Sequence, residues 1–159
     1  MRLHVPVALR WSDLDAYGHV NNVNLLRLLE EARIATFWAP EHGSHSSADG
    51  ALALVKAGPG TQTRTVIAHQ AVDYVAQIPY HRVPLDIEMW LGKIGGASFD
   101  VYYEVWSNQN EQPRTLYARA ATSLVLLDAE SNRPRRILDE ERAAWALYLE
   151  EPLVFRMRG

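Results

Sequence analysis

The sequence contains no cysteine. This absence excludes disulfide bonds, cysteine-ligated zinc and a thiol nucleophile, and it is compatible with a reducing compartment. The sequence also lacks a run of about 20 apolar residues, which a membrane-spanning helix requires, and it has no apolar stretch of signal-peptide length at its start. We therefore expect a cytoplasmic protein without a membrane partner.

Positive charge is not in excess either, because the formal net charge is -3. No overall basic field draws the chain to nucleic acid, so nucleic acid is not an expected partner. The length of 159 residues and the absence of repeats predict one domain over residues 1–159. Four aromatic residues could in principle stack on nucleic acid bases, but no row of basic residues accompanies them, so we expect them to pack within the sheet. They are Trp90, Tyr102, Tyr103 and Trp106.

Hydrophobic periodicity divides the first part of the chain into three segments. Residues 5–11 alternate between apolar and polar side chains up to Trp11, which predicts a half-buried strand. Residues 12–22 are rich in Asp, Gly and Asn and predict a loop. Residues 23–38 are apolar around most of a helical wheel, which predicts a buried helix with Asn21 or Asn22 as its N-cap.

The rest of the chain reads mainly as strands. Long strands are predicted at residues 65–75, 85–94, 98–106 and 115–127, and a short strand is possible at 51–57. Gly95 and Gly96 indicate a tight hairpin. A short helix capped by Asp139 is predicted at 139–150. One buried helix wrapped by one antiparallel sheet is an α+β arrangement, in which oligomerisation can cover the exposed face or edge of the sheet.

The segment from Trp11 to Asn22 places two carboxylates, one imidazole and two amides directly before the helix. A helix start offers unpaired N–H groups that can stabilise an oxyanion. A nearby carboxylate can act as a general base or as a nucleophile, and Gly18 permits a sharp turn beside a ligand. The same residue types also form ordinary polar turns, so composition alone does not establish a site.

The motif D-x-D-x-x-G-H-V-N-N at residues 13–22, followed by an apolar helix ending in E-E-A-R, resembles the hotdog-fold acyl-CoA thioesterases of the 4-hydroxybenzoyl-CoA thioesterase type. The residues Val72-Asp73-Tyr74 and the hairpin at 94–99 extend the likeness, which is weakest at 40–64. The resemblance implies a hotdog fold, with a long central helix wrapped by a curved antiparallel sheet of about five strands and a short C-terminal helix. It also implies a homodimer or homotetramer whose active site lies at a subunit interface.

The resemblance assigns the catalytic role to Asp15, as general base or nucleophile. It places the thioester oxygen at the backbone N–H of Asn22, and His19 and Asn21 would shape the loop and orient water. Asp13 is expected to hold the loop through local hydrogen bonds. The substrate is an acyl-CoA, and neither a metal nor another cofactor is implied.

Substrate contacts are expected from several further residues. Gly18 and Tyr17 belong to the motif loop, and Asn24 occupies a position where relatives often carry an aromatic residue, so it bears on the shape of the acyl pocket. Cationic groups could bind the phosphates of coenzyme A. The candidates are Arg64, His81, Arg82 and Lys93.

Alternative interpretations remain open at this point. Glu30 and Glu31 are a rival catalytic pair, although Glu30 and Arg33 are spaced as a helix-surface ion pair. His42 and His45 have metal-ligand spacing but no evident third ligand. A non-hydrolytic protein that binds or senses acyl-CoA or acyl-carrier protein, or an enoyl-thioester hydratase using His19, would also be compatible with this fold. The sequence does not identify the acyl group.

Overall fold

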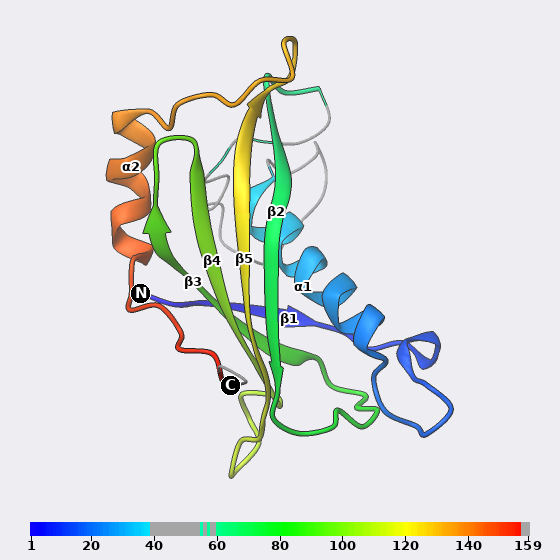
Figure 1. Ribbon diagram of the computed structural model, residues 1–159. Coiled ribbons are helices and arrows are strands. Elements are labelled where there is room, and N and C mark those ends of the chain that lie inside the picture. The colour runs from blue at the N-terminus through cyan, green and yellow to red at the C-terminus, as the bar shows by residue number, and fades with distance from the viewer. Residues whose placement is uncertain (39–54, 56, 58–59, 157–159) are drawn as a thin grey trace.

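The computed structural model describes residues 1–38, 55, 57 and 60–156. It contains one five-stranded sheet in the order β1-β3-β4-β5-β2, in which all neighbouring strands are antiparallel. The helix α1 packs against one face of this curved sheet (Figure 1), and the short helix α2 lies beside β3. The predicted α+β hotdog architecture is therefore confirmed.

The elements follow the predicted order along the chain. Their bounds are β1 Leu3–Val7, α1 Asn22–Phe37, β2 Thr63–Tyr74, β3 Leu85–Ile94, β4 Ser98–Trp106, β5 Leu116–Asp128 and α2 Asp139–Trp145, with single 3-10 turns at Trp11–Asp13 and Ala146–Tyr148.

Several predicted boundaries were wrong, among them the end of the helix predicted at 139–150, which is α-helical only to Trp145 and is followed by a 3-10 turn. β1 ends at Val7, so the apolar alternation does not carry Trp11 into the sheet. Trp11 instead begins a 3-10 turn, is 74% exposed and stacks on Tyr80 with ring centroids 4.5 Å apart. Asp139 is the first residue of α2 rather than its cap, and Leu138 takes the cap position.

The core lies between α1 and the sheet face that α1 covers. Leu25, Leu28 and Leu29 of α1 are buried there against inward residues of the strands, such as Ile87 and Val101. Alternate side chains of a strand point to opposite faces, which explains why the clean alternation in β3 and β4 predicted their core residues.

The predicted burial of α1 holds for only one side of the helix in the single chain. Val23 and Ile34 are exposed, because one sheet can cover only one side of a helix. The proposed surface pair of Glu30 and Arg33 is also wrong. Arg33 is a buried residue of α1. The ion pair on this helix is instead formed by Arg27 and Glu31, which lie one turn apart.

The strand β2 forms an edge of the sheet, where β5 is its single partner among the described strands. Its register shifts between Ile67 and His69, and the apolar side chains of Val66 and Ile67 are 42% and 45% exposed. A long edge with exposed apolar side chains can pair with another chain.

Some predicted features lie outside the described residues. These are His42, His45 and most of the possible strand at 51–57, of which the structure describes the buried Val55 and Ala57. No helix in the described part of the chain is both long enough and apolar enough to cross a membrane.

Candidate active site

The motif loop is organised around a buried carboxylate at Asp13. Its side chain accepts hydrogen bonds from the backbone N–H of Arg10 at 2.7 Å and from Nη2 of Arg27 at 2.5 Å. Its carbonyl oxygen accepts the N–H of Asn21 at 2.9 Å. Burial alone would raise the pKa of Asp13, but the Arg10 N–H and the Arg27 guanidinium lower it below its ordinary value. The predicted structural role of Asp13 is confirmed.

Asp15 forms a tight turn with the residues that follow it. Its Oδ1 accepts the backbone N–H groups of Tyr17 at 2.8 Å and His19 at 3.2 Å. Gly18 has a φ of 79°, a conformation that other residues adopt only with strain, and its N–H donates to the Asp15 carbonyl. Within the described part of the chain, Oδ2 of Asp15 has no hydrogen-bond partner, so this oxygen is available to a ligand.

The start of α1 follows immediately. Asn21 is the N-cap, because its side chain accepts the N–H of Val23 at 2.8 Å and its carbonyl accepts the N–H of Leu25 at 2.9 Å. The N–H of Asn22 precedes the first helical hydrogen bond, and no acceptor for it occurs among the described residues. The helix therefore offers a backbone donor at Asn22.

A cleft of about 450 Å³ opens between the motif loop and the ends of two strands. Asp15, His19, Asn22 and Leu25 form one side, and residues 74–78 together with Tyr117 and Ala118 form the other. The N–H of Val20 donates to the carbonyl of Ile78 at 2.8 Å, which fixes the loop against the second wall. The structure therefore brings Asp15 and the helix start to one cavity.

His19 also lines this cleft. Its Nδ1 is buried and has no hydrogen-bond partner among the described residues. A buried polar atom without a partner is costly unless a ligand or water satisfies it. The cleft is thus lined by a carboxylate residue, a histidine and the residue that begins the helix, and these residue types suit attack of water on a carbonyl group.

The other predicted contact residues are distributed more widely. The Asn24 side chain donates to the carbonyls of Ser12 and Asp13 and does not line the cleft, and the Tyr17 side chain is exposed. His81 contacts the hydroxyl of Tyr117 at 2.9 Å, which places it beside the second wall. Arg82 follows it and is exposed. Arg64 lies at the opposite end of β2, where its side chain donates to Asn132.

Most of the second wall of the cleft was not predicted from the sequence. Residues 74–78 and Tyr117 reach the site because the end of β2 pairs with the start of β5. No motif marks them, and the nearest signal was the Val72-Asp73-Tyr74 run. Of the rival acids, Glu31 pairs with Arg27, and Glu30 lines a separate groove.

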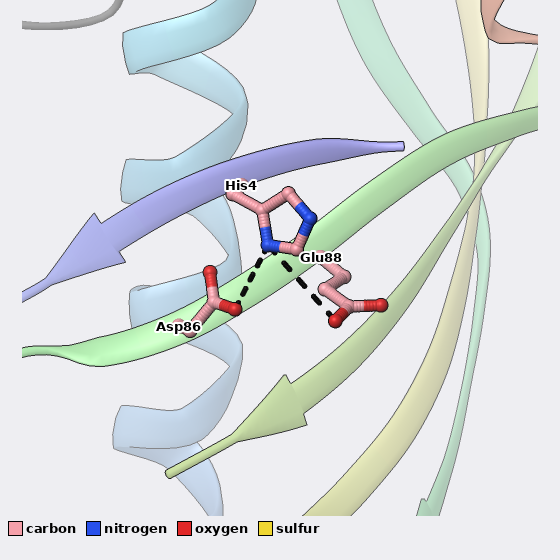
Figure 2. A group of neighbouring side chains, drawn as sticks. All are labelled: His4, Asp86 and Glu88. Carbon is pink, nitrogen blue, oxygen red and sulfur yellow. Dashed lines mark hydrogen bonds and ion pairs between the residues drawn. The ribbon is translucent and has the colours of Figure 1, made fainter. Parts of the chain in front are cut away.

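One cluster has the residue types of a metal site. His4 of β1 points toward Asp86 and Glu88 of β3, with Nδ1 2.9 Å from Asp86 Oδ2 and 3.9 Å from Glu88 Oε1 (Figure 2). Arg114 already binds both carboxylates at 2.5 and 3.1 Å, and Arg2 binds Glu88 at 3.0 Å. A divalent cation would have to compete with two guanidinium groups for these two buried carboxylates, so the cluster fits a charge network better than a cation site.

Comparison with known proteins gives relatives of similar length. The YsmA protein of Bacillus subtilis (strain 168) is 28% identical over 137 residues, which make up 86% of this chain and 80% of YsmA. A predicted thioesterase from Bacillus stearothermophilus superposes with a TM-score of 0.70 and 23% identity, covering 96% of this chain and 99% of its own. A thioesterase from Thermus thermophilus, solved with coenzyme A and zinc, gives a TM-score of 0.62 and 24% identity over 92% of each chain.

A family-level match covers the elements that build the cleft. Residues 9–145 match the sequence model of the thioesterase-like superfamily. This range includes the motif loop, α1 and all strands except β1. The chain is therefore a member of the thioesterase-like superfamily and an enzyme that hydrolyses thioesters.

Proposed function

We propose that this single-domain protein hydrolyses an acyl-CoA thioester to a free carboxylic acid and coenzyme A in the cytoplasm, with Asp15 as the catalytic carboxylate. The observation that carries the proposal is that Asp15 and the first turn of α1 line the same cleft. A carboxylate and a helix start that meet at one cavity can act on the same carbonyl group.

The proposed reaction places the thioester oxygen against the N–H of Asn22. Asp15 then removes a proton from water as the water oxygen attacks the carbonyl carbon, or attacks that carbon itself. The negative charge that develops on the oxygen is stabilised by the N–H and by the positive end of the helix dipole. In the general-base form, collapse of the tetrahedral species breaks the C–S bond, and the proton held by Asp15 passes to the departing thiolate. In the nucleophilic form, collapse expels the thiolate, which takes a proton from water, and leaves an anhydride between Asp15 and the acyl group; water then hydrolyses this anhydride, which releases the acid and restores the Asp15 carboxylate.

Two neighbours shape this proposed site. Asn21 fixes the start of α1 through its cap hydrogen bond, and therefore sets the direction of the Asn22 N–H. His19 also lines the cleft, and we assign it a polar contact with water or with the substrate there. His81 and Arg82 lie close to the second wall, and we assign these two basic side chains to the phosphates of coenzyme A. The coenzyme A bound to the Thermus relative supports this choice of substrate.

We also propose that the protein acts as a homodimer, or as a pair of such dimers, joined through β2. The exposed apolar residues Val66 and Ile67 on this edge support the assignment, as does the uncovered stripe of α1 with Val23 and Ile34. Two copies related by a two-fold axis would pair β2 antiparallel to itself. The start of β2 in one copy would then lie beside its end, at Tyr74, in the other.

The decisive experiment follows thiol release from a panel of aromatic, short-chain and long-chain acyl-CoAs and from an acyl-carrier protein. We expect turnover of at least one thioester by the native protein. Asp15→Asn should lower kcat by roughly 100- to 10,000-fold, the usual contribution of a general base. Asp139→Asn makes the same chemical change on an exposed surface and serves as the control.

Three results would contradict the proposal. An Asp15→Asn variant with the kcat of the native protein would contradict the assigned mechanism. Tight acyl-CoA binding without thiol release by the native protein would indicate a binding or sensing protein. Loss of enoyl-CoA absorbance without thiol release would indicate a hydratase.

A further inference from the structure

Arg33 of α1 is a buried cation that contacts the sheet. It is 6% exposed, and its Nη1 donates to the hydroxyl of Tyr103 at 3.2 Å. No carboxylate in the described part of the chain forms an ion pair with it, whereas six other arginines do so: Arg2, Arg10, Arg27, Arg114, Arg119 and Arg135. Arg33 therefore differs in kind from the paired arginines of this fold.

The polar groups beneath Arg33 do not neutralise it. Burial raises the pKa of Tyr103, so its hydroxyl stays neutral near pH 7 and accepts a hydrogen bond without supplying charge. Beyond it lie Thr122 and Gln70, joined by a hydrogen bond of 3.4 Å, and both are uncharged. A buried charge without a counter-charge is strongly unfavourable. The described residues thus supply no paired counter-charge to Arg33, and an anion bound beside it would stabilise the guanidinium.

A groove of about 440 Å³ gives such an anion access to Arg33. It lies between the C-terminal half of α1 and the first half of β2, and its walls are largely apolar, with Ile34, Phe37 and Trp38 on one side and Ile67 on the other. Glu30 also lines the groove, but it is exposed and forms no ion pair with Arg33. An apolar slot with one buried cation suits an aliphatic or aromatic chain that ends in an anion.

The proposed dimer places this groove close to the catalytic cleft. The groove lies at residues 65–67 of β2, and the cleft lies at residues 74–78, just past its other end. When two β2 strands pair antiparallel about a two-fold axis, the groove of one copy comes beside the cleft of the other. An acyl group attached at the cleft would then extend toward Arg33 of the second copy.

We propose that the groove holds the far end of the acyl group, and that Arg33 selects acyl-CoA substrates whose acyl chain ends in a carboxylate. This inference rests on the proposed function and names the substrate class for the same site. The planar guanidinium can bind a carboxylate through two parallel hydrogen bonds, which neither a neutral chain end nor a single ammonium group reproduces.

The test measures binding in the Asp15→Asn background, where cleavage does not interfere. Calorimetry would compare butyryl- to octanoyl-CoA with the dicarboxylyl thioesters of equal length, succinyl- to suberyl-CoA. At the length that reaches Arg33 we expect the carboxylate to strengthen binding roughly 10- to 100-fold, as charge-assisted hydrogen bonds do. Arg33→Met should abolish this preference, and Arg33→Lys should retain part of it. Arg136→Met removes the same charge from an exposed position as the control.

Several outcomes would overturn the proposal. The preference could be absent at every length, or it could survive Arg33→Met in a protein whose thermal unfolding shows that it is folded. Weakened dimerisation in Arg33→Met, measured by ultracentrifugation, with an unchanged preference would make Arg33 a counter-ion for a carboxylate of the second copy. An Arg33-dependent preference in a native protein that releases no thiol would refute the proposed hydrolysis while leaving the anion site intact.

Discussion

Nη2 of Arg27 lies 2.5 Å from Oδ1 of Asp13, and this contact ties the body of α1 to the loop that carries Asp15. The second carboxylate of the motif therefore depends on the first for its position. Asp13 is fully buried and never faces the cleft, yet it fixes both the turn before Asp15 and, through the Asn21 N–H, the start of the helix.

Removing the Asp13 carboxylate should destabilise the fold strongly. Asp13→Ala leaves Arg27 and the Arg10 N–H without their acceptor, and we expect a loss of about 3 kcal/mol in the free energy of unfolding, measured by urea denaturation. Glu31→Gln removes the other, exposed carboxylate bound to Arg27 and should cost about 0.5 kcal/mol or less. Equal effects of the two substitutions would contradict this assignment.

Stability should decrease at acidic pH, partly because of the same carboxylate. The folded protein holds the pKa of Asp13 below its ordinary value, whereas in the unfolded chain it returns to about 3.9. Its ionised form therefore stabilises the fold above about pH 4, and this contribution is lost as the pH falls through the folded pKa. The difference in unfolding free energy between the native protein and Asp13→Asn should shrink over that range. A difference that is constant down to pH 3 would argue against the ion pair.

Gly18→Ala should lower the free energy of unfolding because of backbone strain alone. The added Cβ would meet no atom within 4 Å, but the φ of 79° is strained for any residue with a side chain. We expect a loss of roughly 1–2 kcal/mol and slower thiol release, because the turn that orients Asp15 would open. Gly96→Ala is the matched control, since its Cβ also meets nothing and its φ is not in the left-handed region. The idea fails if both variants are equally stable in thermal unfolding.

A charge on the free edge of β2 should separate the proposed dimer. Ile67→Lys places an ammonium group among apolar side chains that the second copy would cover, so we expect a monomer in ultracentrifugation and reduced thiol release. Leu147→Lys introduces the same charge at a position 68% exposed beside α2 and should leave the assembly intact. If the native protein is already monomeric, the proposed dimer has no part in the mechanism.

The features that depend on local sequence pattern could be predicted from the sequence. The alternation in β3 and β4, with Gly95 and Gly96 between them, predicted the hairpin, and the motif predicted that Asp15 precedes the start of a helix. Asn21 was recognised as a possible cap because its side chain can bond within the next turn.

Features that depend on three-dimensional neighbours were not predictable in the same way. The opposite wall of the cleft exists because β2 lies beside β5, a pairing of distant segments. Arg33 looked like a surface residue because its spacing from Glu30 does not reveal which side of α1 the sheet covers. Trp11 lies outside β1, although it fits the alternation, because the chain turns after Val7 to form the loop around Asp13.

The strand order also has a consequence for folding kinetics. β3, β4 and β5 follow one another in sequence and can pair as a local meander, whereas β1 must pair with residues 85–89 across about half of the chain. Closing such a long loop is slow because its entropy is lost before the contacts form. The motif loop follows β1 directly, so the catalytic turn should be among the last parts to reach its native geometry, and refolding of activity should lag behind formation of the sheet.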